Sequence, residues 1–388
     1  MNANWNYPTA IRVGAERLSE LGECCRDLDM RSPLLVTDPG LATLPMVGQA
    51  RDACADAGLV CQVFSEIQPN PTGTNVDAGV SAFNQGGHDG VIALGGGSAL
   101  DAGKAIALMA RQSVSLWDLE DVGDNWTRAD ASLIAPIVAV PTTAGTGSEV
   151  GRASVILDEA REVKKIIFHP LMVPKIVILD PVVTVGLPAA LTGATGMDAL
   201  SHSLEAWCSP AYHPMAEGIA IEGIRLVREF LPQAVADGSD LEARTQMLVA
   251  STMGATAFQR GLGAMHALAH PLGALYNAHH GTLNAVLMPY VLQANRLVIE
   301  ARITRLARAI GIANPGFDTF LDWILQLRET LQIAPDLAAL GIDDSDAERI
   351  GEMAKLDPSS GTNPLPFSAS EYQALFLRAL NGNLEAGA

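Results

Sequence analysis

Short runs of apolar, often β-branched residues alternate with helix-like stretches over the first half of the chain. The apolar runs that predict strands lie at residues 33–37, 59–64, 90–94, 134–140 and 175–179. Helical patterns follow the first three of these runs, at residues 45–57, 74–85 and 98–111. Such alternation is typical of a parallel sheet with helices on both faces. We therefore expect a doubly wound, Rossmann-like α/β domain.

The pattern changes after Pro188, where alanine- and leucine-rich stretches with helical spacing take over. Residues 215–228 and 241–259 are examples of these stretches. Glycine and proline continue mainly as breaks between helices. The sequence thus predicts an α/β domain over residues 1–185, followed by an all-α domain over residues 186–388.

Composition and charge narrow the class of protein. The 388-residue chain is 48% hydrophobic and 18% charged, which supplies sizeable cores and argues against disorder. A formal net charge of −18 argues against nucleic-acid or anionic-membrane partners, because both need a basic surface. No apolar run approaches the roughly 20 residues of a membrane span. Five cysteines without a C-x-x-C pair, and an amino terminus unlike a signal peptide, predict a cytoplasmic protein.

The histidines are unevenly distributed. Four of the eight lie within residues 266–280, and His266 and His270 stand four residues apart. Asp198 and His202 show the same interval upstream. A helix places residues i and i+4 on one face, so each pair can direct two metal-binding atoms to the same side. Imidazole together with carboxylate suits iron(II) or zinc, and the helical half is therefore predicted to hold a metal.

A glycine-rich turn at residues 95–98 follows the strand predicted at 90–94 and opens the next helix. Backbone N–H groups at a helix start can bind phosphate, and glycines allow a pyrophosphate to come close. The spacing is not G-x-G-x-x-G, so a purely structural turn is the alternative interpretation. A polar loop at residues 141–149 adds hydroxyl donors after another predicted strand. Asp38 ends an earlier strand and could bind a ribose diol, which favours NAD over NADP, or could simply be a turn residue.

The order and spacing of these motifs resemble those of the iron-containing (group III) alcohol dehydrogenase family. Within that family, the chain is similar to lactaldehyde reductases and 1,3-propanediol dehydrogenases. The resemblance spans nearly the whole chain, and its motifs lie at residues 69–72, 95–104, 141–146, 196–202, 263–270, 280–281 and 363–364. It implies a metal-dependent, NAD-linked dehydrogenase that interconverts a small primary alcohol and its aldehyde by hydride transfer. The metal would polarise the substrate oxygen without changing oxidation state, so Zn²⁺ could replace Fe²⁺.

The resemblance also implies roles for individual residues. The metal ligands would be Asp198, His202, His266 and His280. His270 would lie near the substrate and relay a proton. The cofactor-binding residues would be Asp38, Asn70, Gly96, Gly97, Ser98, Asp101, Thr142, Thr143, Thr146 and Lys164. Lys165, next to Lys164, leaves a one-residue alternative.

The remaining histidines and one acidic residue need separate interpretation. His279 stands where the family usually has proline, and it either supports the metal centre or is simply exposed. A structural role is expected for His88, His169 and His213. Glu205 is expected to be solvated, or to support a ligand from behind, rather than to bind the metal itself.

Several other functions fit parts of the same pattern. A reductase of a semialdehyde or keto acid, of the 4-hydroxybutyrate or maleylacetate type, is the nearest alternative. A zinc-dependent lyase similar to dehydroquinate synthase would recycle NAD within each turnover. A non-catalytic regulator with the same fold is disfavoured by the complete ligand set and by His270. The family resemblance further implies a homodimer or a higher homo-oligomer.

Overall fold

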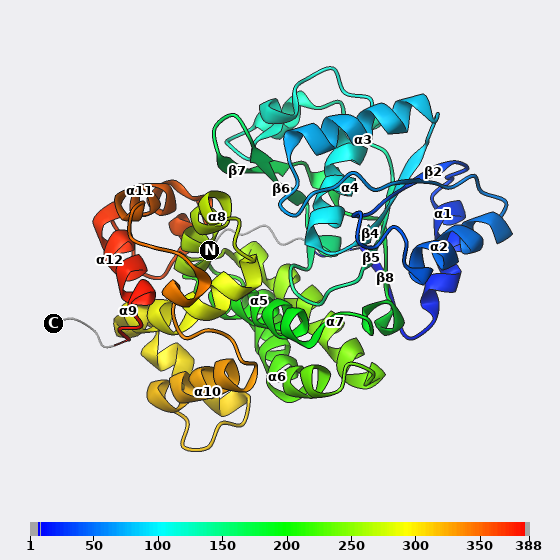
Figure 1. The fold of residues 1–388 in the computed structure, drawn as a ribbon. Coiled ribbons are helices and arrows are strands. Elements are labelled where there is room, and N and C mark those ends of the chain that lie inside the picture. The colour runs from blue at the N-terminus through cyan, green and yellow to red at the C-terminus, as the bar shows by residue number, and fades with distance from the viewer. Residues whose placement is uncertain (1–6, 8, 385–388) are drawn as a thin grey trace. The chain divides into compact units, whose positions relative to one another are not determined.

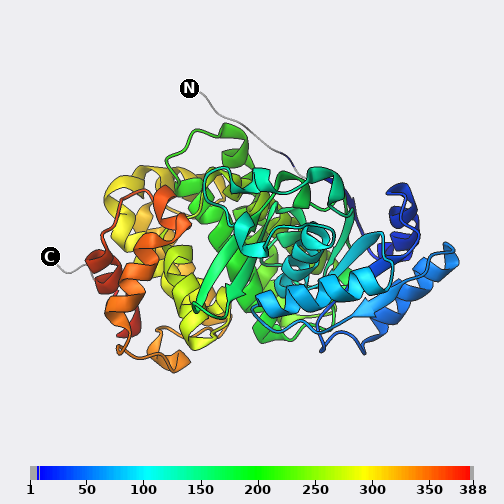
Figure 2. The same ribbon diagram turned by 90° about the horizontal axis from the view of Figure 1, so that it is seen from above.

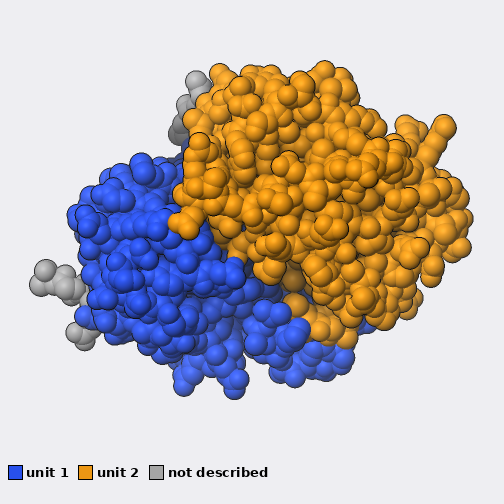
Figure 3. Space-filling model, turned by 45° about the horizontal axis from the view of Figure 1, so that its top comes forward, with its two compact units in different colours: residues 1–6, 188–388 blue, residues 7–187 orange. Residues whose placement is uncertain are grey.

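The computed structural model describes residue 7 and residues 9–384. These residues fall into two compact units that join between Leu187 and Pro188 (Figure 3). Within the described part of the chain, none of the helices combines the length and apolar character needed to cross a membrane.

The N-terminal unit is built on a six-stranded parallel sheet with the strand order β1-β8-β5-β4-β2-β3. Its strands are β1 (Ala10–Val13), β2 (Pro33–Val36), β3 (Gln62–Phe64), β4 (Gly90–Gly95), β5 (Ile137–Pro141) and β8 (Ile176–Leu179). Its α-helices are α1 (Leu21–Asp27), α2 (Pro45–Asp56), α3 (Gly73–Gln85) and α4 (Gly97–Met109).

Alternate residues of the central strand β4 supply cores on opposite faces of the sheet. Ile92 and Leu94 pack in one cluster with buried residues of α1 and α2. Val91 and Ala93 point to the other face, where α4 packs and α3 lies beside it (Figure 1). Helices therefore cover both faces, and the predicted doubly wound parallel sheet is confirmed.

The strand list predicted from the sequence is incomplete. It lacks the edge strand β1 and the antiparallel hairpin of β6 (Ala153–Asp158) and β7 (Val163–Phe168). β1 is only four residues long, its end residues are exposed, and its partner β8 lies far along the chain. Strand β7 buries Ile167 alone, so its pattern carries little hydrophobic signal.

Two predicted strands begin later than expected. The run at 59–64 becomes a strand only at Gln62, because the Leu59 amide still bonds to Cys54 O at the end of α2. The run at 134–140 becomes β5 only at Ile137, immediately after Pro136, which has no amide hydrogen to donate to a neighbouring strand.

The strand order reverses beside β4. The chain passes outward from β2 to β3, then returns across β2 to form β4, and continues on that other side with β5. In open α/β sheets, ligands bind outside the carboxyl ends of the strands at such a reversal. Here the reversal lies between β2 and β4, which end next to Asp38 and the glycine turn.

The described residues of the C-terminal unit form helices and connecting segments, with no strand (Figures 1 and 2). The α-helices are α5 (Ala189–Cys208), α6 (Pro214–Ala236), α7 (Leu241–Ala257), α8 (Ala264–Tyr276), α9 (His280–Ala309), α10 (Phe317–Thr330), α11 (Ala347–Leu356) and α12 (Ala369–Leu380). Helix α5 is central, because every residue from Thr192 to Cys208 is buried. The predicted helical half is confirmed.

Phe83 of α3 offers a test of this packing, because its ring is fully buried. We expect Phe83→Ala to lower the free energy of unfolding of the N-terminal unit by about 3–5 kcal/mol through the cavity it leaves. Urea denaturation followed by circular dichroism measures the change. Asp77→Ala, at an exposed position of the same helix, is the control. A loss below about 1 kcal/mol for Phe83→Ala would contradict the described packing.

Candidate metal centre and dinucleotide site

Three helices bring the four predicted ligands together. Asp198 and His202 lie one turn apart on α5, His266 lies in the first turn of α8, and His280 is the first residue of α9. The Nε2 atoms of His202 and His266 each lie 4.0 Å from Asp198 Oδ1, and that of His280 lies 3.7 Å from it. Three imidazoles thus surround a single carboxylate oxygen.

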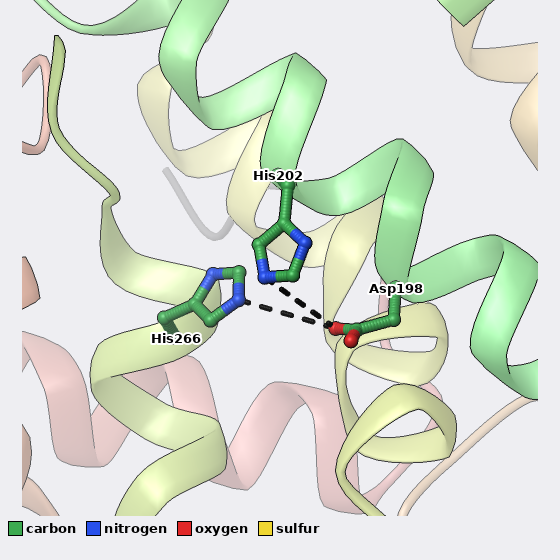
Figure 4. A group of neighbouring side chains, drawn as sticks. All are labelled: Asp198, His202 and His266. Atoms are coloured by element: carbon green, nitrogen blue, oxygen red, sulfur yellow. Dashed lines mark ion pairs between the residues drawn. The ribbon is translucent and has the colours of Figure 1, made fainter. Parts of the chain in front are cut away.

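The centre is largely closed to solvent. Asp198, His202 and His266 are 2%, 5% and 1% exposed, and one potential ligand atom from each lies within 4.8 Å of the others. Figure 4 shows both imidazoles directed at the Asp198 carboxylate. A mixed carboxylate and imidazole donor set is the kind that binds divalent iron or zinc, so the chemistry of these residues fits such a cation.

The Asn284 amide lies at the point on which these atoms converge. Its Nδ2 is 2.8 Å from Asp198 Oδ1 and 3.2 Å from Nε2 of both His266 and His280. Two amide hydrogens cannot fully satisfy three acceptors. The Asn284 Oδ1 atom is also buried without a hydrogen-bond partner. The surplus of acceptors at this point is what a bound cation would neutralise.

Electrostatics favour an ionised carboxylate in the centre. Burial works to raise the pKa of Asp198, but the neighbouring imidazoles and the Asn284 hydrogen bond hold that pKa well below its usual range. Burial likewise works to lower the pKa of His266, but the charge and hydrogen bond of Glu205 outweigh it and raise the pKa overall. Asp198 is therefore in the state that binds metal.

One buried and one partly buried carboxylate contact the histidines on the side away from the centre. Glu205, on the same face of α5 as Asp198 and His202, accepts a 2.7 Å hydrogen bond from His266 Nδ1 and is 4% exposed. Of the two expected roles for Glu205, the solvated one is therefore wrong. Asp357 lies 2.7 Å from His270 Nδ1. Sequence reasoning missed Asp357, since nothing in its local pattern distinguishes it from the many exposed aspartates.

His270 lies beside the centre rather than within the ligand group. Its ring stacks on His280 at a centroid distance of 5.5 Å, and its side chain is 13% exposed. Burial works to raise the pKa of Asp357, but His270 and the hydrogen bonds from Ser359 lower it overall, so the carboxylate stays ionised. The Asp357 contact engages Nδ1 and orients Nε2 as the atom that can exchange a proton.

The other histidines have structural contacts. His279 is exposed, and its Nδ1 accepts a hydrogen bond from the Thr282 amide as the N-cap of α9. Of the two roles considered for His279, exposure is the observed one. His213 and His169 cap α6 and a short 3₁₀ helix, respectively. His88 Nδ1 lies 2.9 Å from Ser32 O. The structural role predicted for these three histidines is confirmed.

In the N-terminal unit, the two predicted cofactor loops lie side by side. Strands β4 and β5 pair up to Gly95 and Pro141, and the Thr142 amide donates to Gly95 O at 2.9 Å. The Thr146 side chain fills the space beside Gly97, where a Cβ would lie only 2.6 Å from its Cγ2. The start of α4 and the threonine loop thus form one surface at the strand ends.

The start of α4 has the properties of a phosphate site. Its N-cap is Gly96, and no side chain caps the helix there, so its first amide groups point outward. Asp38 follows the adjacent strand β2 and accepts a hydrogen bond from the Leu41 amide through Oδ1. Asp38 can form this turn through Oδ1 and still contact a ribose through Oδ2, because a carboxylate has two accepting oxygens.

The β6–β7 hairpin brings Lys164 to Asn70. Lys164 Nζ donates to Asn70 Oδ1 at 2.7 Å, whereas Lys165 pairs with Glu120 and Asp158. Of the two lysines, Lys164 is therefore the one grouped with a candidate cofactor residue. Burial lowers the pKa of Lys164 to about 8, so its charge is more easily lost than that of an ordinary lysine.

Asp101 is engaged within the protein. Its Oδ1 accepts from Ser148 Oγ at 2.5 Å and pairs with Lys104 at 3.2 Å. Its Oδ2 accepts from the Val155 amide at 2.9 Å. These contacts hold the end of the threonine loop and the start of the hairpin against α4, so Asp101 fixes the shape of the cofactor surface. Its predicted proximity to the nicotinamide stays a prediction.

Known proteins resemble this chain over nearly its whole length. The family model of iron-containing alcohol dehydrogenases matches residues 8–181, and the C-terminal model of the same family matches residues 192–380. The 4-hydroxybutyrate dehydrogenase of Cupriavidus necator is 38% identical over 385 residues, covering 96% of this chain and 99% of its own. The 1,3-propanediol dehydrogenase of Klebsiella pneumoniae is 36% identical over 387 residues, covering 97% of each chain. A crystal structure of a 1,3-propanediol oxidoreductase superposes with a TM-score of 0.93 at 35% identity, covering 98% of this chain and all of the other.

Gly281 controls the approach of α9 to α5 at the candidate metal centre. A Cβ at this position would lie 2.3 Å from Ala194 O and 3.2 Å from the Asp198 Cβ. We expect Gly281→Ala to move His280 away from Asp198, to weaken zinc binding by at least about tenfold, and to cost about 1–3 kcal/mol of stability. Competition with a chromophoric chelator measures the affinity, and thermal denaturation measures the stability.

Gly218→Ala on α6 is the matched control, because a Cβ there would meet nothing within 4 Å. Unchanged zinc affinity in Gly281→Ala would show that the close contact between α5 and α9 does not shape the centre.

Proposed function

The chain belongs to the iron-containing alcohol dehydrogenase family, and from this premise we propose that it interconverts a small primary alcohol and its aldehyde with NAD(H) and a divalent metal. Asp198, His202, His266 and His280 would hold the metal. The loops after β2, β4 and β5, together with Asn70 and Lys164, would hold the dinucleotide.

The convergence of three imidazoles, two of them buried, on the buried Asp198 carboxylate carries the proposal. A centre of this composition keeps a net positive charge when it binds a divalent cation, which is what activation of a neutral alcohol requires. A bound cation would polarise the substrate oxygen, and a bound nicotinamide would exchange hydride with the substrate carbon. The buried surroundings strengthen the electrostatic interactions of the centre by excluding water.

His270 would move the proton that alcohol oxidation releases. Its Nδ1 is held by Asp357, so Nε2 is oriented to accept a proton from the substrate side and pass it toward solvent. The partial exposure of the His270 side chain supports such a path. His270 stands outside the ligand group, so its removal and the removal of a ligand have different consequences.

We infer NAD rather than NADP, because a carboxylate at Asp38 would repel a 2′-phosphate. Iron is the metal that the family name indicates, and zinc suits the same donors. Five free cysteines fit a reducing cytoplasm. A homodimer or a higher homo-oligomer is the assembly that we infer from the family resemblance.

A second substrate class is favoured by one relative. The 4-hydroxybutyrate dehydrogenase of Cupriavidus necator matches this chain at 38% identity over nearly its full length. Its name indicates a hydroxy acid whose oxidation gives a semialdehyde. We therefore keep a semialdehyde reductase as the alternative within the same chemistry.

Two variants test the proposed function. We expect the iron- or zinc-loaded protein to form NADH with short primary alcohols, diols or 4-hydroxybutyrate under anaerobic conditions. His266→Ala should lose both the bound metal and turnover, because it removes a ligand. His270→Ala should retain the metal and slow turnover by about 10²–10⁴-fold through loss of the proton relay. Metal content by elemental analysis and NADH absorbance are the measurements.

Full turnover in His266→Ala would refute the ligand assignment, and full turnover in His270→Ala would refute the relay. Turnover with 4-hydroxybutyrate but with no simple alcohol would select the semialdehyde alternative. Bound metal and dinucleotide without turnover on any substrate in the panel would support a regulatory protein instead.

Asp38 offers a separate test of the cofactor. We expect Asp38→Gly to raise kcat/KM for NADPH relative to NADH, because the carboxylate that repels the 2′-phosphate is removed. Initial rates of aldehyde reduction with both reduced cofactors measure the ratio. Asp29→Ala, an exposed position in the same unit, is the control. An unchanged ratio would show that another residue selects the cofactor.

A further inference from the structure

We propose that Glu205 is a positioning residue that fixes the tautomer and orientation of His266 and thereby sets how tightly the centre binds its metal. The inference rests on the proposed metal centre and adds to it a determinant of affinity that is not itself a ligand. It is carried by three hydrogen bonds that converge on one buried carboxylate.

The Glu205 side chain accepts hydrogen bonds from two backbone amides and one imidazole. Its Oε2 accepts from the Gly263 amide and from His266 Nδ1, each at 2.7 Å. Its Oε1 accepts from the Met265 amide, also at 2.7 Å. All three donors belong to the first turn of α8 or its N-cap. The carboxylate belongs to α5 and contacts the start of α8. Glu205 is only 4% exposed, so water does not compete for these hydrogen bonds.

The contact with Nδ1 determines which nitrogen of His266 carries the proton. A carboxylate can only accept, so Nδ1 must donate, and in the neutral ring Nε2 then keeps its lone pair. Nε2 is the atom that faces Asp198, at 4.0 Å, and it accepts from Asn284 at 3.2 Å. The bond behind the ring thus leaves the metal-facing nitrogen able to bind a cation. Such carboxylate contacts also raise the basicity of a ligating imidazole.

An amide in place of the carboxylate would create a conflict. The glutamine side chain has one accepting oxygen and one donating nitrogen, whereas the site presents only donors. In one orientation its amino group faces the Met265 amide. In the other it faces the Gly263 amide and His266 Nδ1. In that second orientation the ring avoids the clash only by moving its proton to Nε2, which blocks metal binding, while the clash with the Gly263 amide remains.

The same carboxylate also caps α8, and this second role must be separated from the first. The N-cap of the helix is Gly263, which has no side chain to cap it, and the first amides are satisfied from other elements. Glu205 binds two of them, and Asn363 Oδ1 accepts from the Ala264 amide at 3.1 Å. Asn363 contacts the start of α8 without contacting His266, so it provides a matched control.

The test measures zinc affinity and the His266 tautomer in the full-length metal-free protein. Zinc dissociation constants come from competition with a chromophoric chelator, and long-range ¹H–¹⁵N NMR of histidine-labelled protein reports the tautomer. We expect Glu205→Gln to weaken zinc binding by about 10–100-fold and to place the His266 proton on Nε2 in part of the molecules. Glu205→Asp keeps an accepting group on a shorter chain, so it should retain the Nδ1–H tautomer with intermediate affinity.

Asn363→Ala should lower the melting temperature while leaving the tautomer and the zinc affinity of the folded protein unchanged. Wild-type affinity in Glu205→Gln, or an equal loss in Asn363→Ala, would overturn the proposal while leaving the metal centre itself intact. If the wild-type protein bound no zinc or iron, the proposed function and this inference would both fail. Should Glu205→Gln not fold, wild-type affinity in Glu205→Asp would overturn the proposal.

Discussion

The structure depends on the cost of burying the Asp198 carboxylate inside a helical unit. Transferring a charged group out of water costs several kcal/mol unless other groups compensate for the lost solvation. Here Asn284 of α9 donates one hydrogen bond to the carboxylate, and the Nε2 atoms of three imidazoles from α5, α8 and α9 lie around the same oxygen. The acceptor atoms at this point outnumber the hydrogens that can be donated to them, so negative charge and lone pairs are left uncompensated. A divalent cation supplies the missing positive charge, which is why this arrangement indicates a metal centre.

Helix packing and helix ends make the convergence possible. Helix α5 is buried on all sides over its second half, so the ligands on it are held by contacts from several helices. Helix α8 ends at Tyr276, the left-handed backbone conformation of its C-cap Asn277 (φ 51°) turns the chain, and α9 then starts at His280. The last ligand therefore returns to the face of α8 that carries His266. Glu205 and Asp357 add a second layer that holds two of the rings from behind.

The sequence predicted those parts of the protein that depend on local periodicity. The strand and helix alternation indicated the doubly wound sheet, and the i, i+4 spacing grouped Asp198 with His202. That His280 joins them did not follow from spacing, because the turn at Asn277 separates it from His270. Glu205 carried a usable signal, since residues 198, 202 and 205 share one helical face. Whether that face met water or a histidine depended on α8, which no local pattern reveals.

The parts that escaped prediction depend on contacts between distant segments. Strand β1 is defined by its pairing with β8, in a register that joins Ala10 to Ile176. The sequence offers two adjacent lysines, Lys164 and Lys165, as the cofactor-contacting residue. Which of them lies beside Asn70 depends on the face that the hairpin turns toward it, and local sequence does not determine that face. The hydrogen bonds of Asp101 to Ser148 and Val155 likewise join segments far apart in the sequence, and its expected position near the nicotinamide stays a prediction. Such residues are distinguished by their partners and not by their own sequence context.

X-ray absorption spectroscopy of the iron-loaded protein tests the central claim most directly, because it reports the atoms around the metal without depending on a substrate. We expect a single kind of iron site whose nearest neighbours are nitrogen and oxygen, with the multiple-scattering signature of several imidazole rings. A spectrum with sulfur neighbours, or with oxygen neighbours and no imidazole signature, would contradict the assignment of the metal to the group around Asp198.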